Sequence, residues 1–233
     1  QMRRFVADAS HELRTPLVSV RGYAELYRMG ALKKPEQIGE AMGRIESEAV
    51  RMTGLVESLL TLTRMDETTK LERTTTNMVS LSIDAAKDAS VADGKRKIVI
   101  TNLEGELLAD SAVIEAGVDA NSMRQVLTNL LANASRFSPD GAQIEIALDN
   151  QQWFDGKRLL TLEVRDHGEG IPEQLRDKVF ERFYRIDNSR NSETGGSGLG
   201  LAIVSTIVKR HEGQIIALET PGGGATFRVT IPA

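Results

Sequence analysis

The stretch Ile38–Leu59, IGEAMGRIESEAVRMTGLVESL, carries apolar residues at alternating spacings of four and three positions. These residues are Ile38, Met42, Ile45, Ala49, Met52, Val56 and Leu59. A stripe with this heptad spacing predicts an α-helix whose apolar side packs against another helix. The sequence therefore predicts helix-on-helix packing in this part of the chain.

A second helix with a similar stripe is predicted before it. Its apolar positions are Val6, Ala9, Leu13, Pro16, Val20, Ala24 and Tyr27. Gly30 suits a helix end, and Pro35 suits the first turn of the next helix. Residues 1–66 are therefore predicted to form a helical hairpin. Because two helices alone bury one stripe each, we expect two copies of the chain to form a dimeric four-helix bundle.

Residues 67–233 lack the continuous heptad pattern of the two predicted helices. Residues 67–76 are polar and rich in threonine, which predicts a linker. Beyond them we expect helices over 78–92, 121–137 and 199–211, strands over 97–101, 112–118, 143–148, 159–166, 214–219 and 225–231, and a turn over 150–157. Mixed elements in this order predict a two-layer α/β sandwich. The whole chain is thus expected to be α+β with two domains.

Composition excludes several classes of function. The chain has 233 residues, a net charge of −4 and no cysteine. The acidic balance argues against a nucleic-acid partner bound through phosphates. Without cysteine there are no disulfides, thiolate metal sites or cysteine nucleophiles. No apolar run approaches the roughly 18 residues of a membrane helix, so no membrane contact is predicted for this segment.

The first helix carries His11 between two positions of its apolar stripe, so the imidazole is expected to project outward. A neutral exposed imidazole can act as a nucleophile near pH 7. Glu12 beside it could accept the ring proton. Thr15 follows one helical turn later on the same face, where its hydroxyl could position a water molecule. The alternative is a solvated histidine without a chemical role.

Two asparagines, Asn129 and Asn133, are one turn apart on an otherwise apolar predicted helix. Buried amides need hydrogen-bonding partners. Here the partner could be Mg²⁺ with its water ligands and a nucleotide phosphate, because magnesium prefers oxygen ligands. Arg136 could meet a phosphate from the end of that helix. The alternative is a pair of structural asparagines in the core or at a cap.

A third motif is Asp166-His167-Gly168-Glu169-Gly170, where a predicted strand runs into a tight turn. Glycines let the backbone approach a flat ligand closely. Asp166 could accept a hydrogen bond from the amino group of an adenine. The alternative is an ordinary turn that contains aspartate and glycine.

A glycine-rich loop, Gly195–Gly200, opens the predicted helix over 199–211. Backbone N–H groups at such a helix start bind phosphate. The loop matches neither the dinucleotide fingerprint nor the Walker loop. The stretch before it carries Arg182, Arg185 and Arg190, which are further candidate phosphate partners. The alternative is a plain flexible linker.

In their order and spacing, these motifs resemble the boxes of the cytoplasmic core of sensor histidine kinases. Phe5–Leu17 is similar to the H box, Asn129–Phe137 to the N box, Asp166–Gly170 to the G1 box, Phe180–Arg185 to the F box and Gly196–Gly200 to the G2 box. The resemblance implies a dimerisation and phosphotransfer hairpin over 1–66, a linker over 67–76, and a catalytic ATP-binding domain of the GHKL type over 77–233.

The resemblance also implies a role for each motif. His11 would accept the phosphoryl group, Glu12 would be its base, Asn133 would hold Mg²⁺, and Asp166 would bind adenine. The nucleotide is further expected to contact Asn129, Arg136, Phe137, Gly168, Gly170, Ile171, Phe183, Arg185, Arg190, Gly196, Gly198, Leu199, Gly200 and Thr226.

The implied function is an ATP- and Mg²⁺-dependent histidine kinase. It would pass the phosphoryl group from His11 to an aspartate in the receiver domain of a response regulator, and it would act as a phosphatase toward that regulator through Thr15. The implied homodimer uses residues 1–66. The chain is expected to be the cytoplasmic portion of a membrane sensor whose other segments lie upstream.

Two other functions remain open at this point. Hydrolytic members of the GHKL superfamily, such as chaperones, topoisomerases and mismatch-repair proteins, carry a glutamate at the position of Asn129, so an ATP-driven clamp is the less favoured enzyme. A dimeric scaffold that binds nucleotide without catalysis is the third possibility.

Overall fold

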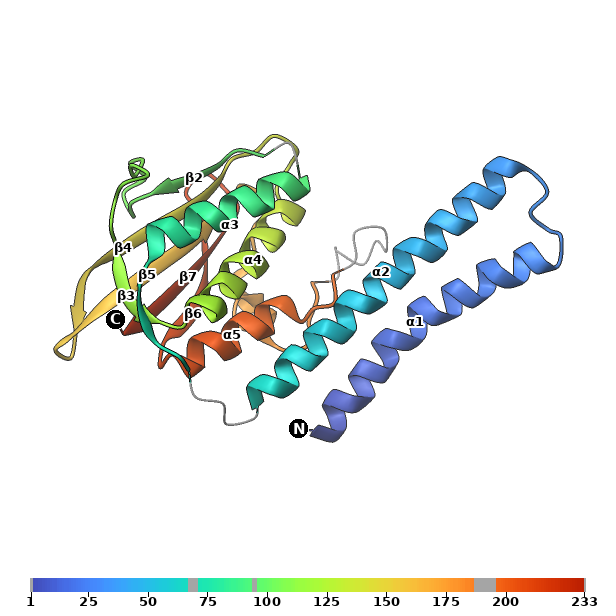
Figure 1. Ribbon diagram of the computed structural model, residues 1–233, viewed down its shortest axis with the longest axis horizontal. Helices are drawn as coiled ribbons and strands as arrows, with labels where there is room; N and C mark the ends of the chain where they lie inside the picture. The colour runs from blue at the N-terminus through green and yellow to red at the C-terminus, as the bar shows by residue number, and fades with distance from the viewer. Residues whose placement is uncertain (1, 67–70, 94–95, 187–195, 233) are drawn as a thin grey trace. The chain divides into compact units, whose positions relative to one another are not determined.

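The computed structural model describes residues 2–66, 71–93, 96–186 and 196–232. It contains two compact units (Figure 1). One unit comprises Gln1–Asp66 with Arg182–Leu199, and the other comprises Glu67–Glu181 with Gly200–Ala233. No helix of the described residues is long and apolar enough to cross a membrane.

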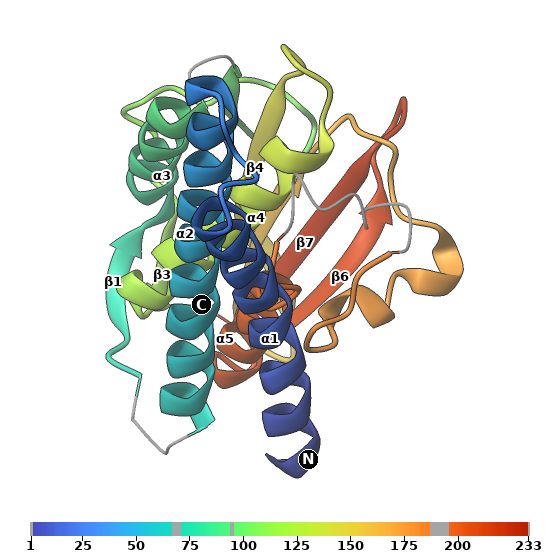
Figure 2. The same cartoon turned by 90° about the vertical axis from the view of Figure 1, so that its right-hand side faces the viewer.

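The first unit is built on two helices, α1 (Met2–Arg28) and α2 (Pro35–Asp66), which run side by side as a hairpin (Figures 1 and 2). Gly30 adopts a left-handed φ of 69°, and the Ala31 N–H donates to the Leu26 carbonyl at 3.0 Å. This αL geometry ends α1. The helical hairpin predicted from the apolar stripes is confirmed.

The packed face of α2 differs from the predicted stripe. Ala41 and Leu55 are 2% and 4% exposed, whereas the predicted positions Met42 and Val56 are 43% and 42% exposed. Met42 and Val56 therefore remain exposed in the single chain, and the helix packing predicted for them stays a prediction. The helix carries two adjacent apolar stripes, and α1 of the same chain covers only one of them. The other stripe stays on the surface of the single chain.

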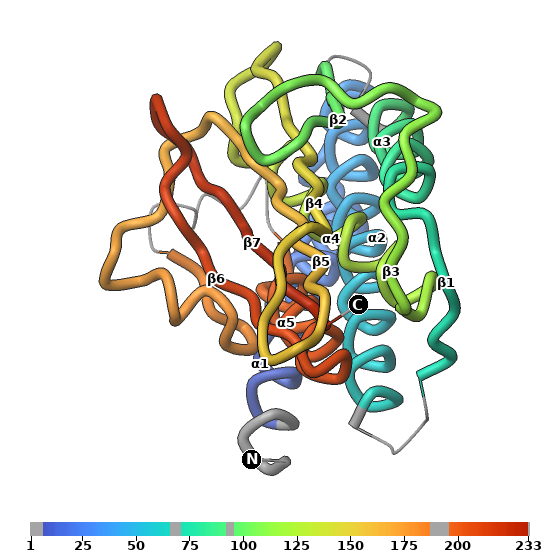
Figure 3. Tube along the Cα trace, turned by 90° about the vertical axis from the view of Figure 1, so that its left-hand side faces the viewer, coloured from blue at the N-terminus to red at the C-terminus, as the bar shows by residue number. Residues whose placement is uncertain are grey.

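The second unit alternates helices and strands around one main sheet. Its regular elements are β1 (Thr74–Asn77), α3 (Met78–Asp93), β2 (Ile98–Thr101), β3 (Glu115–Val118), α4 (Ala120–Phe137), β4 (Ile144–Phe154), β5 (Lys157–Arg165), α5 (Gly200–Arg210), β6 (Gln214–Glu219) and β7 (Ala225–Pro232), with two short 3₁₀ turns, Glu173–Leu175 and Lys178–Phe180. The five-stranded sheet has the order β2-β4-β5-β7-β6, which Figure 3 lets the reader follow. Among the described strands of this sheet, the β2–β4 pair is parallel and the other pairs are antiparallel.

The helices α3, α4 and α5 form a second layer over one face of this sheet (Figure 1). Leu130 and Leu131 of α4 are completely buried, as are Ile146 of β4 and Leu162 of β5. Burial of such side chains removes apolar area from water, which is the main driving force for folding. The predicted two-layer α/β sandwich is confirmed.

Several boundaries differ from the sequence predictions. Thr74–Asn77 forms β1 and pairs antiparallel with β3, although a linker was predicted up to residue 76. Threonine is β-branched and favours strands, so its polarity was misleading. The strand predicted over 112–118 begins only at Glu115.

The turn predicted over 150–157 is instead mostly strand. β4 continues to Phe154 and β5 begins at Lys157, with a register shift between Asp149 and Gln152. Asp155 and Gly156 form the actual turn, with φ values of 50° and 72°. Two residues with positive φ suit the right-handed twist of a tight hairpin. The polar composition around Gln152 had suggested a loop, but it marks a hairpin that is exposed at its tip.

Candidate functional site

His11 lies on α1 and is exposed, as its position beside the apolar stripe predicted. The hydroxyl of Thr15 donates to the backbone carbonyl of His11 at 3.4 Å. This contact places the Thr15 side chain on the same face of the helix, one turn after His11. An imidazole and a hydroxyl are therefore presented together on one exposed surface.

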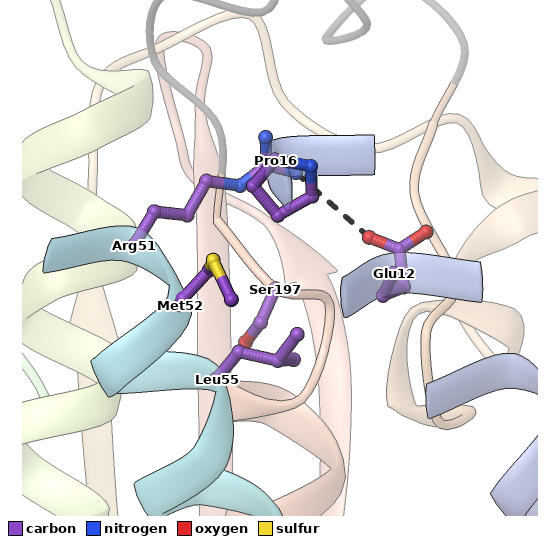
Figure 4. A pocket seen from close by; sticks show the side chains of 6 residues that line it. All are labelled: Glu12, Pro16, Arg51, Met52, Leu55 and Ser197. Atoms are coloured by element: carbon purple, nitrogen blue, oxygen red, sulfur yellow. Dashed lines mark ion pairs between the residues drawn. The ribbon is translucent and has the colours of Figure 1, made fainter. Parts of the chain in front are cut away.

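Glu12 is half-buried and faces the neighbouring helix. One carboxylate oxygen, Oε2, lies 3.8 Å from Nη2 of Arg51 on α2 (Figure 4). Nη1 of the same guanidinium lies 3.7 Å from Oε2 of Glu48. Sequence reasoning missed Arg51, because the residue sits at the edge of the α2 stripe and looks like any exposed cation.

Asp166 lies just beyond the end of β5 and is 2% exposed. Its Oδ1 accepts hydrogen bonds from the backbone N–H groups of Gly168 and Ala225, both at 3.0 Å. Among the residues that the structure describes, none pairs with Oδ2. Oδ2 is not fully enclosed and is free to accept, so the site suits a ligand that donates a hydrogen bond. The amino group of adenine is such a donor.

Two glycines keep the backbone close around Asp166. A Cβ atom at Gly168 would lie 2.2 Å from the carbonyl oxygen of Phe137, at the end of α4. A Cβ atom at Gly224 would lie 2.0 Å from the carbonyl oxygen of Asp166. The structure thus brings the N box and the G1 box together. Gly224 was not predicted as a site residue.

The asparagines of the N box lie on α4. The Asn129 amide donates to the Gln125 carbonyl at 2.9 Å. Its oxygen would lie 3.1 Å from a Cβ atom at Gly200, the first residue of α5. Asn133 follows one turn later and is half-buried. The Asn129 amide therefore lies near the start of α5, where backbone N–H groups are unpaired within the helix.

Other predicted site residues lie at the end of α4, on β7 and in the turn after Asp166. The Arg136 guanidinium stacks over the Phe137 ring at 5.1 Å, at the end of α4. Thr226 follows Ala225 in β7, and its hydroxyl lies 2.9 Å from that of Thr220. Ile171 and Gly170 continue the turn after Asp166, and Gly170 has a φ of 75°.

The remaining predicted residues belong to the first unit. The Phe183 N–H donates to the Gly198 carbonyl at 2.9 Å, so the F box is joined to the G2 box. Leu199 is completely buried, while Arg185 and Gly196 are half-buried. Arg190 lies outside the described residues.

His211 at the end of α5 is a site feature that sequence reasoning missed. The ring is completely buried, and its Nδ1 lies 2.9 Å from the Ile207 carbonyl. Burial lowers the pKa of His211, and the nearby Arg73 lowers it further, against the opposing hydrogen bond to Ile207. The ring is therefore neutral at pH 7, with Nδ1 donating its proton to that carbonyl.

Asp119 caps the start of α4. Its Oδ1 accepts from the Ser122 N–H at 2.8 Å, and its Oδ2 accepts from the Glu72 N–H at 3.1 Å. Burial by itself would raise the pKa of Asp119, but the hydrogen bonds from Ser122 and Glu72 hold it below its usual value. The start of the helix that carries both asparagines is thus fixed by an ionised carboxylate.

Two family models match the chain. Residues 1–68 match the His Kinase A (phospho-acceptor) domain, and residues 118–233 match the histidine kinase-, DNA gyrase B-, and HSP90-like ATPase family. The chain belongs to the sensor histidine kinase family. The family and the fold class predicted from the motifs are confirmed.

The relatives found for this chain include further histidine kinases. The probable sensor histidine kinase TcrY of Mycobacterium tuberculosis is 44% identical over 232 residues, which cover 99% of this chain but 46% of TcrY. The crystal structure of full-length ShkA in complex with AMPPNP matches 98% of this chain and 45% of its own, with a TM-score of 0.62 and 26% identity. The Acinetobacter baumannii histidine kinase AdeS shares the fold, with a TM-score of 0.67, 22% identity and coverage of 95% and 97%. The chain spans less than half the length of TcrY.

Proposed function

We propose that this chain uses ATP to phosphorylate its own His11 and then passes the phosphoryl group to an aspartate of a response-regulator receiver domain. The observation that carries the proposal is the exposed imidazole of His11 on the hairpin that matches the phospho-acceptor family. An exposed imidazole can approach both a nucleotide and a partner protein.

The nucleotide is proposed to bind in the second unit with adenine at Asp166. The open Oδ2 would accept a hydrogen bond from the adenine amino group, while Oδ1 stays with its two backbone donors. The start of α5 and Arg136 would face the phosphates. ShkA was solved in complex with AMPPNP, a nucleotide of this class, which supports the proposal.

Mg²⁺ is proposed to bind through the amide oxygen of Asn133, with Asn129 beside it. Within the described residues, no cluster of three or more His, Asp and Glu side chains could hold a metal. An ion at the site would therefore depend on amide, phosphate and water oxygens, which suit magnesium. When bound, Mg²⁺ neutralises charge on the phosphates.

In the proposed reaction, an unprotonated nitrogen of His11 attacks the γ-phosphorus of ATP. The bond from that phosphorus to the bridging oxygen breaks, and ADP leaves. Glu12 takes the proton from the other ring nitrogen, which keeps the phosphorylated imidazole uncharged. Asn129 carries an amide and so cannot act as the base that would activate water, which favours transfer over hydrolysis.

The same proposal includes the oligomeric state, the domain organisation and the location of the kinase core. A second copy would cover the exposed stripe of Met42 and Val56 on α2, giving a dimeric four-helix bundle. Residues 1–66, 67–76 and 77–233 would be the phosphotransfer hairpin, the linker and the catalytic domain. The core would work on the cytoplasmic side of a membrane sensor and, through Thr15, also remove phosphate from its regulator.

The test is labelling of the purified chain with ATP that carries a labelled γ-phosphate. We expect label on the wild type and none on His11→Ala, while His167→Ala serves as the matched histidine control and keeps its label. Undiminished labelling of His11→Ala would refute the proposal.

A further inference from the structure

Three charged residues gather where the hairpin presents His11. Glu12 comes from α1, and Glu48 and Arg51 come from α2. The Arg51 guanidinium uses Nη2 toward Glu12 at 3.8 Å and Nη1 toward Glu48 at 3.7 Å. Because the two carboxylates face different nitrogens, Arg51 bridges them.

The bridge is more shielded than an ordinary surface ion pair. The side chains of Arg51, Glu12 and Glu48 are 22%, 35% and 23% exposed. By contrast, Arg21 and Glu25 on α1 form an ion pair whose side chains are 76% and 47% exposed. Water and salt screen charges less at partly buried sites, so the attraction within the bridge is less screened than that of the surface pair.

Apolar side chains border the bridge. Pro16 of α1 and Met52 and Leu55 of α2 line the same hollow as Glu12 and Arg51 (Figure 4). These neighbours limit the directions in which the Glu12 side chain can turn. The Arg51 guanidinium lies within ion-pair distance of Oε2 of Glu12, and none of the described residues pairs with its Oε1. One oxygen of the carboxylate is therefore anchored while the other can accept a proton.

We propose that Arg51 is a positioning residue that anchors Glu12 so that Oε1 can take the ring proton of His11. The inference rests on the proposed function, because it needs His11 to be the phosphoryl acceptor. Arg51 touches neither nucleotide nor imidazole in this role. Glu48 holds the guanidinium from the other side and keeps it at the level of Glu12.

This role differs from that of a purely structural ion pair. A structural pair would change the stability of the hairpin and leave phosphorylation intact once the protein is folded. A positioning residue changes the rate constant of the chemical step, because a base displaced by about 1 Å can slow a reaction by about a hundredfold. Its effect also disappears when the base itself has been removed.

The experiment measures kcat and the KM for ATP of His11 phosphorylation in the full chain, with circular dichroism to verify folding. We expect Arg51→Met to lower kcat about 10–100-fold with an unchanged KM. Arg51→Lys should recover part of the rate, because it keeps the charge but loses the planar fork. Arg21→Met is the matched control and should behave like the wild type.

The decisive comparison is the double variant. Glu12→Gln combined with Arg51→Met should be no slower than Glu12→Gln alone, to within about twofold. A wild-type kcat in Arg51→Met, or losses that multiply in the double variant, would overturn the role of Arg51. An unlabelled His11 in the wild type would instead overturn the proposed function, and the role of Arg51 with it.

Discussion

The backbone N–H of Asp119 donates a hydrogen bond to Nε2 of His211 at 3.2 Å. The contact joins the start of α4 to the end of α5, two helices that also carry the N box and the end of the G2 box. Arg73 extends the cluster, because its guanidinium lies 3.3 Å from Glu212, next to His211. The chain that enters the second unit is therefore tied to the helices of the proposed nucleotide site.

This contact predicts a pH dependence of stability. The pKa of His211 is lowered in the folded protein, so the unfolded chain binds more protons below its ordinary value of 6.5. The contribution of neutral His211 to the free energy of unfolding is therefore fully present above about pH 6.5. It decreases as the pH drops toward the lowered pKa of the folded protein. We expect the wild type to unfold at lower urea concentration at pH 5.5 than at pH 7.5, measured by circular dichroism.

Two histidine variants separate this effect from other titrating groups. His211→Leu should lose about 1–3 kcal/mol at pH 7.5, because it leaves the Asp119 N–H without a partner, and its pH dependence should shrink. His167→Gln replaces a half-exposed histidine and should keep the wild-type pH dependence. An unchanged pH dependence in His211→Leu would show that other groups cause it.

Asp166→Asn should weaken nucleotide binding. The amide nitrogen cannot accept the adenine hydrogen bond, and hydrogen bonds to a charged group contribute about 1.5–3 kcal/mol, so the affinity should fall about 10–150-fold. Calorimetric titration with AMPPNP measures this. Glu169→Gln changes an exposed carboxylate three positions later and should bind normally. Equal affinities for both variants would remove Asp166 from the site.

Gly224→Ala should damage the same site by a steric route. Its Cβ would meet the Asp166 carbonyl oxygen at 2.0 Å, and its φ is 114°. Gly222→Ala is the matched control, since it shares a positive φ of 89° but has no atom within 4 Å of the added Cβ. We expect AMPPNP affinity to fall only in Gly224→Ala. A similar loss in both variants would point to backbone strain alone.

Thr15→Ala should keep phosphorylation of His11 and lose most phosphatase activity toward the regulator. The hydroxyl lies one turn from His11 on the exposed face, where it could orient a water molecule on a phosphoaspartate. Losing one positioned donor costs on the order of 100–1000-fold. Thr15→Ser retains the hydroxyl and should remain active. Parallel loss of both activities in Thr15→Ala would contradict the division of roles.

The sequence revealed the elements and the motifs better than the contacts between them. Helical periodicity located α1 and α2, but Ala41 and Met42 are both apolar, so spacing alone could not tell the face toward α1 from the exposed face. Glycines within a motif, such as Gly168, were predictable because the motif itself implied close approach.

Contacts between distant parts of the chain escaped prediction for a physical reason. Asp166 is held by Ala225, which is 59 positions away, and nothing local to either residue records that pairing. Arg51 and His211 were missed in the same way, since an arginine on a helix edge and a histidine near a helix end have no distinct local pattern. Their roles follow only from side chains that folding brings to them.

The most direct test of phosphoryl transfer to His11 is a single-turnover experiment in which excess chain consumes ATP and all three products are counted. We predict that each ADP formed is matched by one phosphoryl group on His11, with little free phosphate. Release of one free phosphate per ADP, with His11 unmodified, would show a hydrolase and contradict the proposed kinase.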